Sequence, residues 1–194
     1  GEDGVDGLQI GHETPAAEAY TEFQQYVRGL RERGIILAVC SKNDESIAQS
    51  GFSHPDSVLK LTDFVSFHAN WEPKNINIKE IAAEINIGTD SMVFLDDNPA
   101  ERQIVRDTMP EVAVPEIDPV DVSSFIRAIE GAGYFEPVTI SDDDLKRHGT
   151  YMENKQRKDL ENTMKSYDDF LASLSMVAEI GPFLPIYFDR IAQL

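Results

Sequence analysis

The stretch at residues 91–99, Ser-Met-Val-Phe-Leu-Asp-Asp-Asn-Pro, constrains the fold of this chain more than any other. Residues 92–95 form an unbroken apolar run bounded by turn residues, which is typical of a strand buried on both faces of a parallel sheet. Asp96 and Asp97 follow directly, and open α/β sheets bind their ligands at the carboxyl ends of their strands. The stretch therefore predicts a central strand that carries two carboxylates to the edge of a sheet.

The acidic pair, Asp96 and Asp97, has two interpretations. Adjacent carboxylates repel each other, so a cation beside them favours the ionised state of both. Mg²⁺ suits such ligands, because it typically takes one or two carboxylates together with phosphate oxygens and water. Taken alone, the pair also fits a solvated acidic turn, since acids are exposed by default.

Helical and strand patterns alternate from Thr14 to Gly131. Strands are expected at residues 35–40, 64–67, 91–95 and 111–114, each between amphipathic helices. The helices are expected to begin with Thr14-Pro15, Glu45, Lys74, Asn98-Pro99 and Asp118-Pro119, and the short helix from Glu45 is expected to end at Gln49. Asn98 and Glu101 have the spacing of a capping box. This order predicts an α/β, Rossmann-like fold in which helices cover both faces of a parallel sheet.

The sequence changes character after Pro137. Residues 141–165 are highly charged and helical in tendency, a helix is expected at 167–174, and a strand at 175–180. We therefore expect a domain at residues 1–136, a helical linker at 137–165 and the start of a truncated second module at 166–194. Both ends of the chain are expected to be internal to a longer polypeptide.

Composition limits the partners of the chain. The formal net charge is -18, from 35 acids against 17 bases, which opposes binding to nucleic acid or to an anionic membrane. No apolar run approaches the length of a membrane span. A single cysteine excludes an internal disulfide and favours a reducing, cytoplasmic location.

Polar residues follow three of the expected elements. They are Ser41, Lys42 and Asn43 after the strand at 35–40, Lys74 at a helix start, and Asp96 with Asp97. Because the carboxyl ends of parallel strands share one edge, these groups are expected to converge on a phosphate and a Mg²⁺ ion. Ser41 would donate a hydrogen bond to a phosphate oxygen, and Lys74 would supply a point charge.

Three segments together carry a family pattern: Val-Cys-Ser-Lys-Asn at 39–43, Trp-Glu-Pro-Lys at 71–74 and Phe-Leu-Asp-Asp-Asn-Pro at 94–99. They resemble the second, third and fourth motifs of the haloacid dehalogenase (HAD) superfamily, and their residues are most similar to those of its FkbH-like branch. The resemblance implies a Mg²⁺-dependent phosphatase that works through an aspartyl-phosphate. FkbH-like proteins load a glyceryl unit from a phosphorylated glycerate, a three-carbon acid, onto an acyl carrier protein in polyketide biosynthesis.

The resemblance also assigns roles to residues. Ser41, Lys42, Asn43 and Lys74 would bind substrate, and Asp96 would hold the metal. Asp97 would be a second ligand to the metal or to water, or a partner for Lys74. The family's first motif, Asp-x-Asp-x-Thr, which supplies the nucleophile and the acid, does not occur in this sequence. Turnover by the family mechanism is therefore not expected from the chain as it stands.

Cys40 is a further catalytic candidate beside Ser41 and Lys74. The resemblance implies a cysteine thioester during glyceryl transfer, and Lys42 or Mg²⁺ nearby would help to form the thiolate. Successive strand side chains point in opposite directions, however. If Ser41 faces the phosphate, Cys40 faces away and acts as a small core residue.

Three functions compete on these observations. The first is a phosphatase and glyceryl transferase of the FkbH-like kind. The second is a generic HAD phosphatase for small molecules. The third is a non-catalytic HAD-like module that docks a carrier protein through the bases between Lys146 and Lys158.

Overall fold

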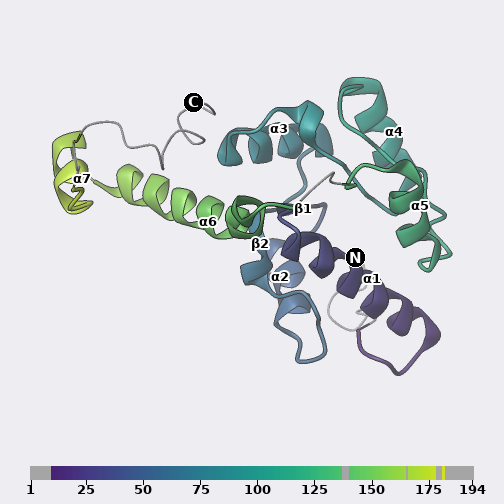
Figure 1. Cartoon of the computed structure of the whole chain (residues 1–194). Helices are drawn as coiled ribbons and strands as arrows, with labels where there is room; N and C mark the ends of the chain where they lie inside the picture. Colours follow the sequence, from purple (N-terminus) through teal and green to yellow (C-terminus); the bar gives the residue numbers. More distant parts are fainter. Residues whose placement is uncertain (1–9, 137–139, 165, 178–180, 182–194) are drawn as a thin grey trace. The chain divides into compact units, whose positions relative to one another are not determined.

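The computed structural model describes residues 10–136, 140–164, 166–177 and 181, and Figure 1 shows its helices and strands. The chain divides into two compact units, Gly1–Lys155 and Gln156–Leu194. The first unit contains α1 (Pro15–Glu32), β1 (Leu37–Ser41), α2 (Glu45–Ser53), η2 (Leu61–Asp63), β2 (Phe64–Ala69), α3 (Lys74–Ile85), η3 (Thr89–Ser91), α4 (Pro99–Thr108) and α5 (Ser124–Ala132). Helix α6 (Asp142–Thr163) crosses the boundary between the units, and α7 (Tyr167–Ser173) belongs to the second.

The sheet is parallel, as predicted, but smaller than expected. Strands β1 and β2 pair in register from Ala38↔Ser66 to Ser41↔Ala69. The predicted central strand at 91–95 forms only one parallel bridge, Val93↔Ala113, and its first residue, Ser91, belongs to η3. In the described part of the chain, the expectation of one sheet with four strands is therefore wrong, whereas the mixed α/β class is confirmed.

A largely apolar cavity lies between β1 and the central segment. The cavity has a volume of about 500 Å³, and side chains of β1 and α3 as well as Met92 and Phe94 line it. The strand at 37–41 is accordingly not buried on both faces, since Ala38 is exposed.

Helix α3 contacts both strands and α4, and its buried face forms part of the hydrophobic core of the first unit. Ile78 packs in a cluster with Phe94 and Val105, while Ile81 packs against Val65 of β2. Full burial of side chains of this size contributes about 1.5 to 3 kcal/mol each. The start of α3, and with it Lys74, is thereby held next to the ends of both extended segments.

The predicted helix starts are confirmed at α1 and α4. Thr14 Oγ1 accepts a hydrogen bond from Ala17 N at 3.1 Å, and Asn98 Oδ1 accepts one from Ala100 N at 2.9 Å. The capping box at α4 is wrong. The backbone N–H of Asn98 donates to Asp96 Oδ1 at 2.9 Å, and the Glu101 carboxylate pairs with Lys42 instead.

Two other helices differ in length from the prediction. Helix α2 continues to Ser53, because Phe52 packs edge-on against Phe64 and Phe67 of β2. Helix α5 begins at Ser124 and not at Asp118, because the Asp118 carboxylate accepts a hydrogen bond from Val120 N and closes a turn. Tertiary packing and side-chain turns thus moved these boundaries.

The first-unit part of α6 is anchored rather than solvated. His148 Nε2 lies 3.1 Å from the Thr62 carbonyl oxygen. Lys155 Nζ donates to the Val65 carbonyl at 2.9 Å and pairs with Glu84 at 2.8 Å. The domain boundaries expected at 136 and 165 stay predictions, and most of the segment after 177 lies outside the described residues. No helix within the described ranges combines the length and apolarity that a membrane span requires.

Candidate active site

Lys74 is a buried cation at the first position of α3. Its side chain is 5% exposed, and Nζ lies 3.1 Å from Asp96 Oδ2. Nζ also donates to the Cys40 carbonyl oxygen at 2.5 Å and lies 5.9 Å from the centroid of the Phe94 ring. Burial of an ammonium group is costly unless it is paired and hydrogen-bonded. These contacts therefore join the end of β1 to the end of the central segment.

Asp96 and Asp97 follow the extended residues 92–95 and differ in environment. The Asp96 side chain is 11% exposed, and its two oxygens face Lys74 Nζ and the Asn98 amide. Asp97 is exposed. Burial and, after it, the negative charge of Asp97 raise the pKa of the Tyr20 phenol, which places that charge close to α1.

The end of β1 and the residues after it present a hydroxyl, an ammonium and an amide group. The carbonyl of Ser41 accepts a hydrogen bond from Asn70 N at 3.1 Å. Lys42 Nζ pairs with Glu101 Oε1 at 2.6 Å, and Asn43 Oδ1 accepts a hydrogen bond from Asp44 N. Lys42 Nζ therefore already has a carboxylate partner, whereas the sequence predicted that Lys42 would bind the phosphate of a substrate.

One cavity of about 500 Å³ brings all seven candidate residues together. Its polar lining consists of Cys40, Ser41, Lys42, Asn43, Lys74, Asp96, Asp97, Asn98 and Glu101. Its apolar lining consists of Tyr20, Phe23, Leu95, Ile117 and Phe125. Trp71 is not part of this lining. It is 67% exposed, and its indole N–H donates to Asp44.

Cys40 is half-buried beneath this cavity. Its side chain packs against both core clusters around α3. Burial raises the pKa of the Cys40 thiol to about 11, with Lys74 acting in the opposite direction and Asp96 and Glu101 adding to the rise. A neutral thiol is a poor nucleophile, so this environment favours the core role over the thioester role.

The acidic pair can supply part of the ligand set of Mg²⁺, and the remaining ligands would come from outside the protein. Within the described residues, no group of three or more His, Cys, Asp or Glu side chains could hold a metal by itself. Mg²⁺ commonly takes only one or two protein carboxylates and obtains its remaining ligands from phosphate and water. Asp96 and Asp97 match that donor set, with Lys74 beside them as a cation for the phosphate.

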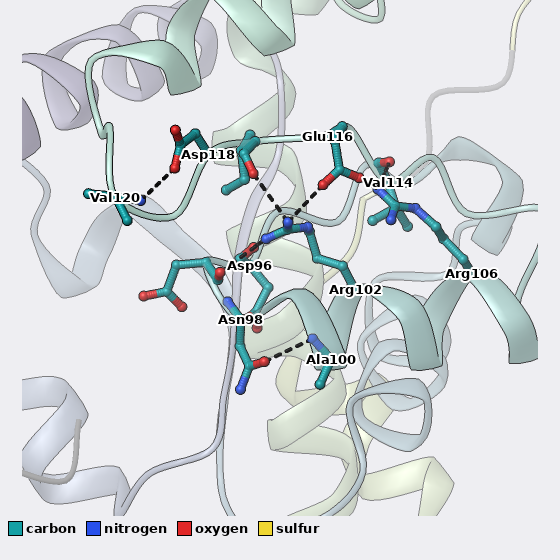
Figure 2. A network of polar contacts seen from close by, with 11 residues as sticks. Asp96, Asn98, Ala100, Arg102, Arg106, Val114, Glu116, Asp118 and Val120 are labelled. Carbon is teal, nitrogen blue, oxygen red and sulfur yellow. Dashed lines mark hydrogen bonds and ion pairs between the residues drawn. The ribbon is translucent and has the colours of Figure 1, made fainter.

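Sequence reasoning missed two residues, Glu101 and Arg102. Figure 2 shows Arg102 of α4 at the centre of a polar network behind the acidic pair. Its guanidinium donates to the backbone carbonyls of Asp96 and Asp97 at 2.8 and 3.0 Å. Both residues lie one helical turn after the Asn98-Pro99 start. This spacing is the signal that could have placed them beside the loop.

The fold and the cavity together define an edge of an α/β domain that gathers carboxylates, ammonium groups and a hydroxyl, and the chain is similar to a solved structure. That structure is the N-terminal part of the protein BF1531 from Bacteroides fragilis, which contains a phosphatase domain and is complexed with Mg. It is 47% identical in sequence, with a TM-score of 0.67 over 71% of this chain. The chain spans 37% of the matched chain. No family model and no curated protein matches the sequence. The match supports a phosphatase-type domain and does not distinguish the FkbH-like branch.

Proposed function

We propose that this chain forms part of a Mg²⁺-dependent phosphatase domain that acts on a phosphorylated three-carbon acid. The observation that carries the proposal is the convergence of Ser41, Lys74, Asp96 and Asp97 on one cavity, with Lys74 and Asp96 3.1 Å apart. The Mg-bound phosphatase domain at 47% identity supports the same reaction class.

Each residue has a distinct task in this proposal. Lys74 Nζ neutralises a phosphate oxygen, and the Ser41 hydroxyl donates a hydrogen bond to another. Asp96 and Asp97 hold Mg²⁺, which when bound withdraws charge from the phosphoryl group and orients it for attack. Because these charged and polar groups are already in place before the substrate binds, they do not have to move during the reaction.

The reaction is hydrolysis of a phosphate monoester. A nucleophile bonds to phosphorus, the ester P–O bond breaks, and the leaving alkoxide takes a proton. Water then releases inorganic phosphate. The HAD resemblance assigns nucleophile and acid to an Asp-x-Asp-x-Thr motif, which is absent from the given sequence. The proposal therefore concerns the full-length protein.

The test is phosphate release from phosphoglycerate by the full-length protein with Mg²⁺. Asp96→Ala is expected to abolish release, because it removes both the metal ligand and the partner of Lys74. Asp107→Asn is the matched control, since Asp107 lies on α4 and bonds only Gln103 among the contacts described. Equal activity of wild type and Asp96→Ala would remove Asp96 from the mechanism.

The finer proposal is transfer of the glyceryl unit to an acyl carrier protein, as the FkbH-like motifs suggest. Mass spectrometry of a carrier protein after incubation with enzyme and substrate distinguishes this activity from a generic phosphatase. A glyceryl adduct supports transfer, and phosphate release without an adduct supports the generic enzyme. For the docking alternative, the exposed bases are Lys146, Arg147, Arg157 and Lys158, of which Arg147 pairs with Asp144, whereas Lys155 is engaged with Glu84.

A further inference from the structure

Arg102 is an unusual residue for the interior of a small domain. It lies in α4, is 1% exposed, and heads the fully buried side chains by volume. A guanidinium group stays charged in proteins, so its burial requires partners for its N–H groups. The identity of those partners indicates what the side chain does.

The guanidinium joins two segments of backbone. Nη1 donates to the carbonyls of Asp96 and Asp97 at 2.8 and 3.0 Å. Nη2 donates to the Ile117 carbonyl at 3.1 Å and to Glu116 Oε1 at 2.9 Å. Figure 2 shows the Arg102 guanidinium between Asp96 and Glu116. The Nε atom is buried without a partner among the described residues.

These and two further contacts hold both the backbone and the side chain of Asp96 in place. Its carbonyl is held by Arg102, and its carboxylate is held by Lys74 Nζ and by the Asn98 amide. Because a guanidinium is planar and its donors point in fixed directions, it restricts the orientation of the peptide groups it binds. A lysine ammonium in the same place would provide a single point of attachment.

We propose that Arg102 is a positioning residue that holds the Asp96–Asp97 backbone so that both carboxylates face the metal and the phosphate. This inference rests on the proposed function, because it assigns the carboxylates to a metal. Residues that orient metal ligands from behind typically change metal affinity about 10- to 100-fold when substituted.

Arg106 provides a matched control on the same helix. It donates to Glu116 Oε2 at 2.6 Å and to the Val114 carbonyl at 3.0 Å. It thus shares the Glu116 carboxylate and the neighbouring backbone with Arg102, but the contacts described for it do not include the acidic pair. The Arg106 side chain is 32% exposed against 2% for Arg102, so its substitution controls for loss of the Glu116 and backbone contacts, whereas loss of positioning would follow only from substitution of Arg102.

The experiment compares Arg102→Lys, Arg102→Gln and Arg106→Lys in the full-length protein. Mg²⁺ affinity is measured by calorimetry, and backbone order is measured by amide hydrogen exchange at residues 96–98. We expect both Arg102 variants to bind Mg²⁺ at least about tenfold more weakly and to exchange faster at 96–98. Arg106→Lys is expected to match wild type in both measurements.

The outcomes separate this inference from the proposed function. If wild-type protein binds no Mg²⁺, the proposed function fails and the inference falls with it. If wild type binds Mg²⁺ and a folded Arg102 variant retains its affinity, only the inference fails. Unfolding of both Arg102 variants would assign the residue to the core and would also overturn the inference.

Discussion

The buried pair between Lys74 and Asp96 gives the sharpest prediction for stability. Lys74→Met keeps most of the apolar stem beside the Phe94 ring but removes the charge that faces Asp96. Removal of one partner from a buried ion pair costs about 3 to 5 kcal/mol. Asp96 retains the Asn98 amide and its side chain is 11% exposed, so the lower end applies, about 3 kcal/mol.

This loss translates into a measurable shift in melting temperature. For a chain of 194 residues, each kcal/mol lowers Tm by about 2 to 4 °C, so Lys74→Met should lower it by about 6 to 12 °C. Thermal unfolding followed by circular dichroism measures the shift. The double variant Lys74→Met/Asp96→Asn should be more stable than Lys74→Met alone, because it leaves no unpaired charge in the interior.

Arg28→Met is the control for this measurement. Arg28 also pairs with a carboxylate, at 3.2 Å from Glu32, but the two side chains are 55% and 58% exposed. Pairs between exposed side chains contribute about 1 kcal/mol or less. The reasoning would be refuted if Lys74→Met melted within about 2 °C of wild type, or if the two substitutions in the double variant were simply additive.

Two further predictions concern titratable groups other than the acidic pair. Because burial raises the pKa of the Cys40 thiol to about 11, iodoacetamide at neutral pH should alkylate it at least about a hundredfold more slowly than a free cysteine. Mass spectrometry follows the reaction, and a rate like that of glutathione would contradict the prediction. Burial and, after it, Arg31 lower the pKa of His148 below its ordinary 6.5. The unfolded chain therefore binds more protons just below pH 6.5, and stability should fall as the pH decreases through that window. His148→Gln should flatten the dependence of Tm on pH there, and an unchanged slope would exclude His148 as its source.

The sequence predicted the convergence at the site better than it predicted the sheet. The apolar runs before Ser41 and Asp96 placed both residues at the ends of extended segments, and both line one cavity. The same pattern could not show that an apolar cavity separates these segments, because hydrogen bonding between strands depends on tertiary spacing.

The partners of charged residues were the least predictable part. Glu101 has the spacing of a capping box, but in the structure it pairs with Lys42, which lies 59 residues away in sequence. From the sequence, Arg102 would be expected on the surface of a helix, but in the structure it is almost fully buried. Propensity and spacing describe local contacts, whereas these two contacts depend on how separate segments pack.

The charges that line the cavity have a consequence for the order in which ligands arrive. Three carboxylates, Asp96, Asp97 and Glu101, face two ammonium groups, Lys42 and Lys74, in a chain of formal net charge -18. A phosphate ester that enters alone therefore meets an excess of like charge. A divalent ion that enters first reverses the local sign, so under the proposed function the cavity favours an order in which the cation precedes the anion.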